Sequence, residues 1–482
     1  MNIRIVTKVI GFLLILIGLF MLLGIPFSIY YGSDDILSLL IAGLGTSGVG
    51  SIMWFANRVE YKDELSQRDG YLIVTLGWLL ASIFGSLPFL INGSISSFTD
   101  AFFETVSGFT TTGASVINNV EAMPYGLLFW RSMTHWLGGM GIIVLSLAIL
   151  PLLKIGGMSL YQAEVAGPSK DKFHPRIQET AKRLWAIYVL LTLVETILLM
   201  FGGMNLFDAL CHSFGTLASG GFSTKNASVA YYHSPFIEYV IIVFMFLAGT
   251  NFTLHYLALK GNLLNYFKDS EFRFYLMFII FVVFGAALYL DFHNNQPWEL
   301  SFRNSAFSVI TVLSSTGFVN GNYEKWAPFF SEIFLVLLLF GACAGSTSGG
   351  VKMVRYQILL KNSILELKRL IHPKAVLPVR QNNKAVPPEI ISKIAAFVLL
   401  YLVVFLLGSV ILAITGLDLS SAMGGVAACL GNIGPGLGST GPATTYANVP
   451  DLGKWTLSFI MLLGRLELFT ILILFSPSFW KK

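Results

Sequence analysis

Ten long apolar segments divide this chain, and they limit its fold more than any other feature. A helix needs about 20 mostly apolar residues to cross the hydrocarbon core of a membrane. The predicted spans are Val9–Ile29, Ile36–Phe55, Tyr71–Ile91, Leu127–Leu153, Leu184–Phe201, Phe236–Leu259, Phe274–Leu290, Phe329–Cys343, Ile394–Thr415 and Trp455–Phe475. Only 12% of the 482 residues are charged, whereas a soluble protein carries about 25%. The sequence therefore predicts an all-α integral membrane protein, and it excludes a soluble enzyme, a disordered chain and a nucleic-acid-binding protein.

The basic residues of the loops indicate how these segments cross the membrane. Cytoplasmic loops carry an excess of Lys and Arg. Of the 31 Lys and Arg residues, all lie in the termini or in loops on one side except Arg131, Lys225, Arg303, Lys325, Lys454 and Arg465. An even number of crossings returns the chain to the side where it began. We therefore expect both termini and the basic loops to lie in the cytoplasm.

Four connections between the predicted spans repeat one pattern without gaps. In each, a polar residue is followed by about nine mostly apolar or small residues, a short polar run and, thirteen positions after the start, a glycine. The repeats are Asp100–Ala114, Asp208–Phe222, Asn304–Phe318 and Ser421–Pro435, with glycines Gly113, Gly221, Gly317 and Gly434. Asp, Asn and Ser are preferred helix N-caps. Asp100, Asp208, Asn304 and Ser421 are therefore predicted to start four helices that are too short to span the membrane.

This repeated unit is suited to binding a cation. Irregular backbone at membrane depth is tolerated only where it lines a cavity or is buried in protein. A short helix that ends within the membrane directs its partly negative C-terminal end there, and the loop that follows can offer carbonyl oxygens in place of a hydration shell. Four such loops around one axis predict a cation filter. Its candidate residues are Thr110, Thr111, Thr112, Gly113, Ser219, Gly220, Gly221, Ser314, Ser315, Thr316, Gly317, Gly431, Asn432, Ile433 and Gly434.

At these loops the chain resembles a known superfamily of potassium transporters. The motifs are TTTGA (Thr110–Ala114), ASGGF (Ala218–Phe222), SSTGF (Ser314–Phe318) and GNIGP (Gly431–Pro435). They are similar to those of the Trk, Ktr and HKT proteins, and the two additional N-terminal spans make the chain most similar to the Trk-type membrane subunit. The resemblance covers essentially the whole chain and implies a K⁺-selective pore with K⁺ as the transported ion. A serine at the position of Gly113 goes with Na⁺ permeation in this superfamily, so glycine there favours K⁺.

The resemblance also implies an assembly and a location. It implies a homodimer in the bacterial inner membrane and a cytosolic, TrkA-like regulatory subunit that binds NAD or ATP, while this chain binds no nucleotide. It divides the chain into an N-terminal two-helix segment and four pore repeats. Their boundaries are residues 1–70, 71–160, 161–262, 263–384 and 385–482. The basic loop 361–393 and residues 156–183 could dock the regulatory subunit, and loop 361–393 could instead bind lipid headgroups.

The eighth predicted span is interrupted and suggests a gate. Four of the twelve residues of Gly341–Lys352 are glycine, and such a stretch is a poor helix interior. Either the span ends at Phe340 and a cytoplasmic loop follows, or the loop lies within the membrane and faces the pore. The resemblance favours an occluding loop in the third pore repeat. The predicted gate comprises Gly341, Ala344, Gly345, Ser346, Thr347, Ser348, Gly349, Gly350, Lys352 and Arg465.

Arg465 lies ten residues into the last predicted span. A charge at that depth usually faces the bundle interior or a cavity. It either pairs with a carboxylate elsewhere or acts as a positive barrier below the filter, and the resemblance supports the barrier. Glu104 and His212 are expected to form hydrogen bonds behind the filter, and Arg131 and His135 are expected to have interfacial or packing roles. We expect K⁺ uptake through a gated filter; the alternative is a Na⁺- or H⁺-coupled K⁺ symporter that works by alternating access.

Overall fold

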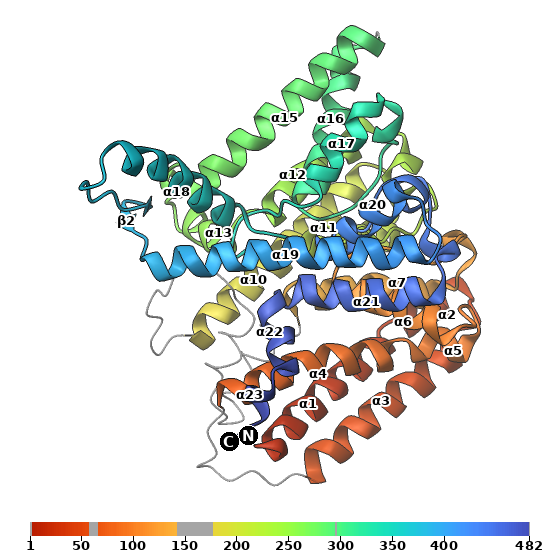
Figure 1. Ribbon diagram of the computed structural model, residues 1–482. Helices are drawn as coiled ribbons and strands as arrows, with labels where there is room; N and C mark the ends of the chain where they lie inside the picture. Colours follow the sequence, from red (N-terminus) through yellow and green to blue (C-terminus); the bar gives the residue numbers. More distant parts are fainter. Residues whose placement is uncertain (1, 57–65, 142–176, 295, 482) are drawn as a thin grey trace.

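A computed structural model of the chain describes residues 2–56, 66–141, 177–294 and 296–481. Within these residues the regular elements are helices, apart from one short hairpin of β1 (Arg380–Gln381) and β2 (Lys384–Ala385). Long helices run side by side through the molecule, and shorter ones fill the space between them (Figure 1). The chain is thus all-α in class, as its apolar segments predict.

The helices follow the order of the predicted spans. The N-terminal segment contains α1 (Ile3–Leu22), α2 (Ile25–Tyr31) and α3 (Ile36–Ala56), and it is followed by α4 (Gln67–Gly85), α5 (Leu87–Asn92), α6 (Phe98–Phe109), α7 (Tyr125–Trp136) and a π-helical turn, Leu137–Gly141. Next come α10 (Ile177–Phe201), α11 (Leu206–Ala218), α12 (Pro235–Ala248), α13 (Phe252–Leu259), α14 (Leu264–Lys268) and α15 (Ser270–Asn294). The remainder is α16 (Trp298–Leu313), α17 (Pro328–Leu337), α18 (Met353–Ile371), α19 (Pro388–Ile414), α20 (Leu419–Leu430), α21 (Asp451–Arg465), α22 (Leu468–Leu472) and α23 (Pro477–Trp480).

Six helical segments of the described chain are long and apolar enough to cross a membrane, and two bent helix pairs raise this number to eight. The chain is therefore a multi-pass membrane protein. The two remaining predicted spans correspond to α7 and α17, which are shorter. The predicted span Leu127–Leu153 extends beyond residue 141, and its later part lies outside the described residues. The number of ten crossings stays a prediction.

Two predicted spans bend sharply between two helices. The span Phe236–Leu259 bends by 103° between α12 and α13, and the span Trp455–Phe475 bends by 113° between α21 and α22. Both sequences are mostly apolar, so hydropathy alone predicts a straight helix in each case. The first bend occurs at Gly249, whose backbone carbonyl accepts a hydrogen bond from Cys343 N (3.0 Å) instead of continuing the helix. The second occurs at Glu467, whose φ of +54° cannot be helical.

Four short helices, α6, α11, α16 and α20, end where the sequence predicts but begin earlier. Their last residues, Phe109, Ala218, Leu313 and Leu430, directly precede the four polar runs. Their N-caps are Ser97, Asn205, Pro297 and Asp418. The four predicted N-caps are therefore wrong.

The three-residue error has a physical reason. Asp100, Asp208 and Ser421 occupy the third helical position, where their N–H groups donate to the side chain of the true cap at 3.4, 2.7 and 3.1 Å. A polar or acidic residue in the first turn is stabilised by the same helix end as the cap, so residue type does not separate the two positions. Asn304 lies further along α16, and its side-chain oxygen accepts a hydrogen bond from Asn320 (3.2 Å).

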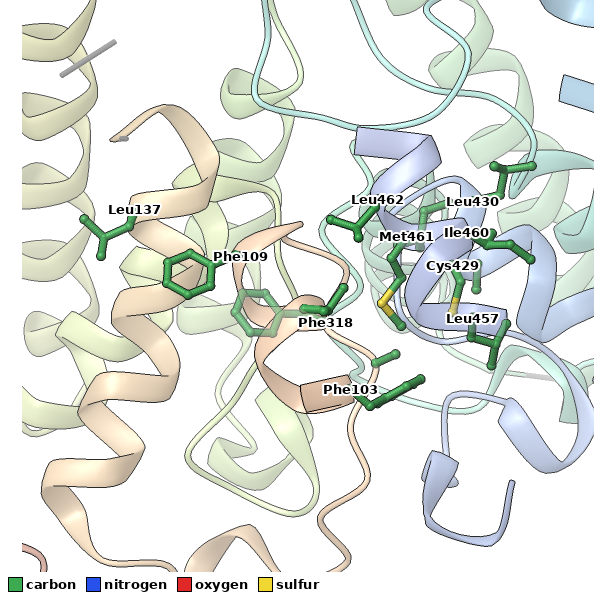
Figure 2. Close-up of a cluster of buried hydrophobic side chains, with 14 of the residues drawn as sticks. Phe103, Phe109, Leu137, Phe318, Cys429, Leu430, Leu457, Ile460, Met461 and Leu462 are labelled. Carbon is green, nitrogen blue, oxygen red and sulfur yellow. The ribbon is translucent and has the colours of Figure 1, made fainter. Parts of the chain in front are cut away.

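The hydrophobic core surrounds the short helices. Figure 2 shows Phe103 and Phe109 of α6 near Phe318, and Cys429 and Leu430 of α20 beside Leu457, Ile460, Met461 and Leu462 of α21. All of these side chains are buried. The core thus holds the ends of the short helices, and the turns that follow them, inside the molecule.

Both termini lie at the same end of the helices (Figure 1). Arg68, just after the start of α4, donates to the backbone carbonyl of Lys481 (2.6 Å), and the next residue, Asp69, accepts from Asn2 N (2.8 Å). An even number of membrane crossings requires this arrangement, because each crossing moves the chain to the opposite side.

Candidate functional site

The same turn follows each of the four short helices. Two residues before each repeated glycine, a residue with a side chain adopts the left-handed conformation. These residues are Thr111 (φ +56°), Ser219 (+57°), Ser315 (+53°) and Asn432 (+52°). Such backbone costs about 1–3 kcal/mol each for a residue other than glycine and clusters at functional sites. Four equivalent strained residues in four separate loops therefore indicate one shared function.

The hydrogen bonds of the four turns are equivalent as well. In each, the residue after the left-handed one donates its N–H to the carbonyl five residues earlier. The pairs are Thr112 to Ser107 (2.9 Å), Gly220 to Gly215 (2.8 Å), Thr316 to Thr311 (2.8 Å) and Ile433 to Ala428 (2.8 Å). These carbonyls belong to the last turn of each short helix. The local backbone therefore repeats four times, in agreement with the gap-free sequence repeat.

The four turns contact one another in a closed order. A Cβ atom placed on Gly113 would lie 2.6 Å from Gly221 N, and one on Gly221 would lie 2.7 Å from Gly317 O. A Cβ on Gly317 would overlap with Ile433 O, and one on Gly434 would lie 2.6 Å from Thr112 O. Each turn thus touches the next, and the fourth touches the first. The amide of Asn432 also donates to Thr112 Oγ1 (3.0 Å), which joins the last turn to the first.

The predicted filter residues meet at one cavity. Gly113, Gly221, Gly317 and Gly434 all line a cavity of about 120 Å³, which has room for several water molecules. The other predicted filter residues lie buried in the turns: Thr110, Thr111, Thr112, Ser219, Gly220, Ser314, Ser315, Thr316, Gly431, Asn432 and Ile433. The hydroxyls of Thr110 and Thr112 are 2.8 Å apart, and so are those of Ser314 and Thr316. The structure therefore brings together all four sets of predicted filter residues.

The loop Gly341–Lys352 packs against the turns. Thr347 Oγ1 lies 2.9 Å from Ser219 Oγ of the second turn, and Gly349 N donates to Ser315 Oγ of the third turn (2.7 Å). A Cβ on Gly349 would lie 2.5 Å from Gly431 O of the fourth turn. Ala342, Cys343, Thr347 and Ser348 are buried. The alternative of a cytoplasmic loop after Phe340 is therefore wrong: this loop lies inside the helix bundle.

Neighbouring helices hold the loop in place. At the bend after α12, Gly249 O accepts from Cys343 N (3.0 Å), and Phe252 N donates to Gly345 O (3.0 Å). The carboxylate of Glu271 in α15 accepts from the N–H groups of Ala344 (2.7 Å) and Val354 (3.0 Å). The loop is therefore tied to two helices that come before it in the chain.

Contacts within the loop close it on itself. Lys352 Nζ donates to Ser348 O, and Gly341 N donates to Val351 O (2.8 Å). Ser346 Oγ lies 2.9 Å from Ser348 Oγ. Gly350 has a φ of +67°, which a residue with a side chain rarely adopts.

Arg465 is the last residue of α21 and contacts the loop directly. Its guanidinium donates to the carbonyl of Thr347 (2.8 Å) and to those of Gly138 (2.6 Å) and Gly139 (2.8 Å). Glu467, two residues later, pairs with Arg355 of α18 (2.6 Å). The structure thus places a positive charge beside the loop, at the bend of the last helix pair.

Three buried polar residues, Glu104, His212 and Arg131, lie behind the turns. Glu104 and His212 form hydrogen bonds behind the turns as expected: Glu104 accepts from Val116 N (2.8 Å), and His212 lies 2.9 Å from Ser223 Oγ. Of the two roles expected for Arg131, interfacial or packing, the structure shows the second, because Arg131 is buried and pairs with Glu104 (2.7 Å). The sequence could have indicated the pairing of Arg131, because a charged residue in an apolar segment requires a partner.

Three comparisons relate this chain to known proteins. Residues 38–482 match the family model TrkH, described as a cation transport protein. The chain is 43% identical to the Trk system potassium uptake protein TrkH of Salmonella typhimurium and 42% identical to that of Escherichia coli K12, over 100% of both chains in each case. It also resembles the crystal structure of the potassium transporter TrkH from Vibrio parahaemolyticus, with a TM-score of 0.90, 39% identity and 100% of both chains covered.

Proposed function

Since the chain belongs to the TrkH family of cation transport proteins, we propose that it takes up K⁺ through a filter built from its four turns. As a member of this family it is a transport protein and not an enzyme. The observation that carries the proposal is the closed order of contacts among the four turns, whose glycines line one cavity. K⁺ would lose its water there, and backbone carbonyls would replace its hydration shell.

The short helices give this site its preference for a cation. All four end at the turns, so their partly negative C-terminal ends are directed at the same place. Because α6, α11, α16 and α20 are embedded in the core, these dipoles are screened less than at a surface. The site would therefore attract a cation without a carboxylate in the ion path.

The loop Gly341–Lys352 would be the gate. Its contacts with Ser219 and Ser315 hold it against the second and third turns, and Arg465 binds its Thr347 carbonyl. An occluding loop and a positive charge at the same depth would both oppose the passage of K⁺. Residues 71–160, 161–262, 263–384 and 385–482 would each supply one pore repeat, and residues 1–70 would form a separate N-terminal pair.

The proposal includes a location and partners. The relatives are named as parts of a Trk system, which supports a further Trk component. A TrkA-like subunit that binds NAD or ATP would dock on the cytoplasmic loops, and the chain would form a homodimer in the bacterial inner membrane with both termini in the cytoplasm. The candidate docking segment 156–183 lies largely outside the described residues.

Flux into liposomes tests this function. The purified protein in liposomes should take up ⁸⁶Rb⁺, and external K⁺ should compete with this uptake at much lower concentration than Na⁺. Uptake that Na⁺ and K⁺ inhibit equally would contradict a K⁺-selective filter.

A single-molecule measurement separates a pore from the alternative, a coupled symporter. A gated pore should give unitary currents in a planar bilayer when only K⁺ is present. Transport that requires a Na⁺ or H⁺ gradient and gives no unitary current would favour alternating access instead.

A further inference from the structure

Arg131 and His135 of α7 connect to the chain segments that follow the first two turns. Arg131 and His135 are four residues apart, so they lie on the same side of the helix. Arg131 is 3% exposed and His135 is fully buried. We call residues 114–116 and 222–223, which follow Gly113 and Gly221, the first and second exit segments. Each contacts this face of α7 or its partner Glu104.

A chain of hydrogen bonds joins the two exit segments through an ion pair. On the first segment, Ser115 Oγ (2.9 Å) and Val116 N (2.8 Å) donate to the carboxylate of Glu104, which is 1% exposed. Arg131 Nε donates to the same carboxylate (2.7 Å). Arg131 Nη1 then donates to Ser223 O of the second segment (3.1 Å). One guanidinium thus holds both segments at a fixed separation.

His135 forms a second connection, from the first short helix to the second exit segment. Its Nδ1 lies 2.7 Å from Gly108 O near the end of α6, and Phe222 N donates to its Nε2 (3.1 Å). A carbonyl only accepts, so Nδ1 carries the proton and the imidazole is neutral. The ring also stacks on Phe222, with 4.1 Å between centroids. A Cβ on Gly220 would lie 2.7 Å from the imidazole, so the second turn is packed directly against it.

We propose that Glu104, Arg131 and His135 are positioning residues that set the selectivity of the site for K⁺ over Na⁺. The inference rests on the proposed function and extends it to residues that do not belong to the four turns. K⁺ and Na⁺ have the same charge and different size, so a site distinguishes them by where its oxygens are held. Gly113 and Gly221 come directly before the two exit segments, and Arg131 lines the same cavity as both glycines. A change in the spacing of these segments therefore moves two sides of the cavity.

Three substitutions test these contacts. Glu104→Gln keeps the shape and removes the charge that binds Arg131. Arg131→Lys keeps the charge, but an ammonium lacks the planar fork that reaches Glu104 and Ser223 together. His135→Phe keeps a ring on Phe222 and removes both hydrogen bonds. The matched control is Asp35→Ala, which removes the carboxylate that accepts from Leu127 N (2.7 Å) at the opposite end of α7.

The readout is the ratio of the Na⁺ and K⁺ concentrations that halve ⁸⁶Rb⁺ uptake into liposomes, measured together with thermal unfolding. Each of the three variants should lower this ratio by about tenfold, and coupling between contacting residues should make Glu104→Gln and Arg131→Lys non-additive. Asp35→Ala should lower the unfolding temperature and leave the ratio unchanged. A purely structural role predicts less folded protein with a normal ratio in all four variants.

The outcomes separate this inference from the proposed function. If the unmodified protein prefers K⁺, and folded Glu104→Gln and Arg131→Lys retain its ratio, the positioning role is overturned and the function stands. If the unmodified protein shows no preference for K⁺, the proposed function itself fails. Should Glu104→Gln fail to fold, the charge-conserving Arg131→Lys still decides the question.

Discussion

At the scale of single residues, Gly113 provides the sharpest test of the filter. Its φ is +80°, and a Cβ there would lie 2.6 Å from Gly221 N of the next turn. Gly113→Ser should therefore displace two neighbouring turns and lower the preference for K⁺ over Na⁺ in the competition assay. A well-folded variant with an unchanged preference would remove Gly113 from the filter.

A substitution at Gly32 is the control that distinguishes the effect of backbone strain from the effect of contact between turns. Gly32 has a φ of +68°, and a Cβ there would meet no atom within 4 Å. Gly32→Ser carries a similar left-handed backbone cost, about 1 kcal/mol, without a neighbour to displace. It should lower the unfolding temperature slightly and leave ion preference unaltered.

Arg465 is the second residue with a defined expectation. Its guanidinium binds the carbonyls of Thr347, Gly138 and Gly139. Two unit charges ~4 Å apart repel by about 4 kcal/mol at an effective dielectric of 20, so a cation close to Arg465 meets a barrier. Arg465→Ala should increase K⁺ flux per folded molecule, and Arg465→Lys should largely preserve the low flux. Lower stability with no gain in flux would instead indicate a structural role.

At the scale of elements, the loop Gly341–Lys352 is the part expected to move. Deletion of Ala344–Gly350 should raise basal ⁸⁶Rb⁺ flux, because it removes the backbone that contacts the second, third and fourth turns. A milder variant, Glu271→Ala, removes the acceptor of Ala344 N and Val354 N and should raise flux less. Flux at or below the unmodified level in both folded variants would show that the loop is not the gate.

The sequence predicted the location of these elements better than their ends and bends. The four polar runs were found because spacing and glycine persist in all four repeats, although their chemistry differs at Thr111, Ser219, Ser315 and Asn432. Three of the four helix starts were misplaced because more than one residue near the start of each helix could serve as a cap, and Asn304 lies further along α16. At the bend, Gly249 O accepts a hydrogen bond from Cys343 N, nearly one hundred residues later in the chain. The hydropathy of a segment does not depend on such distant contacts, so it could not predict the bend.

At the scale of the whole molecule, the placement of the termini is open to direct measurement. The three native cysteines, Cys211, Cys343 and Cys429, are buried. A cysteine introduced at an exposed position should therefore report its own side of the membrane. Ser96→Cys, before α6, should react with an impermeant thiol reagent on intact cells. Lys374→Cys, in the basic loop after α18, should react only after the membrane is opened; the reverse pattern would invert the proposed topology.

The contact between the last turn and the first has a consequence for how the protein is made. Asn432 and Thr112, which join these turns, are 320 residues apart in the chain. A ribosome releases the first, second and third turns long before the fourth, so the ring has a missing side throughout most of synthesis. The loop Gly341–Lys352 precedes the fourth turn in the chain, so it emerges before the ring can close. The order of the chain therefore places the segment that lies against the turns into the growing protein before the contact that closes the ring can form.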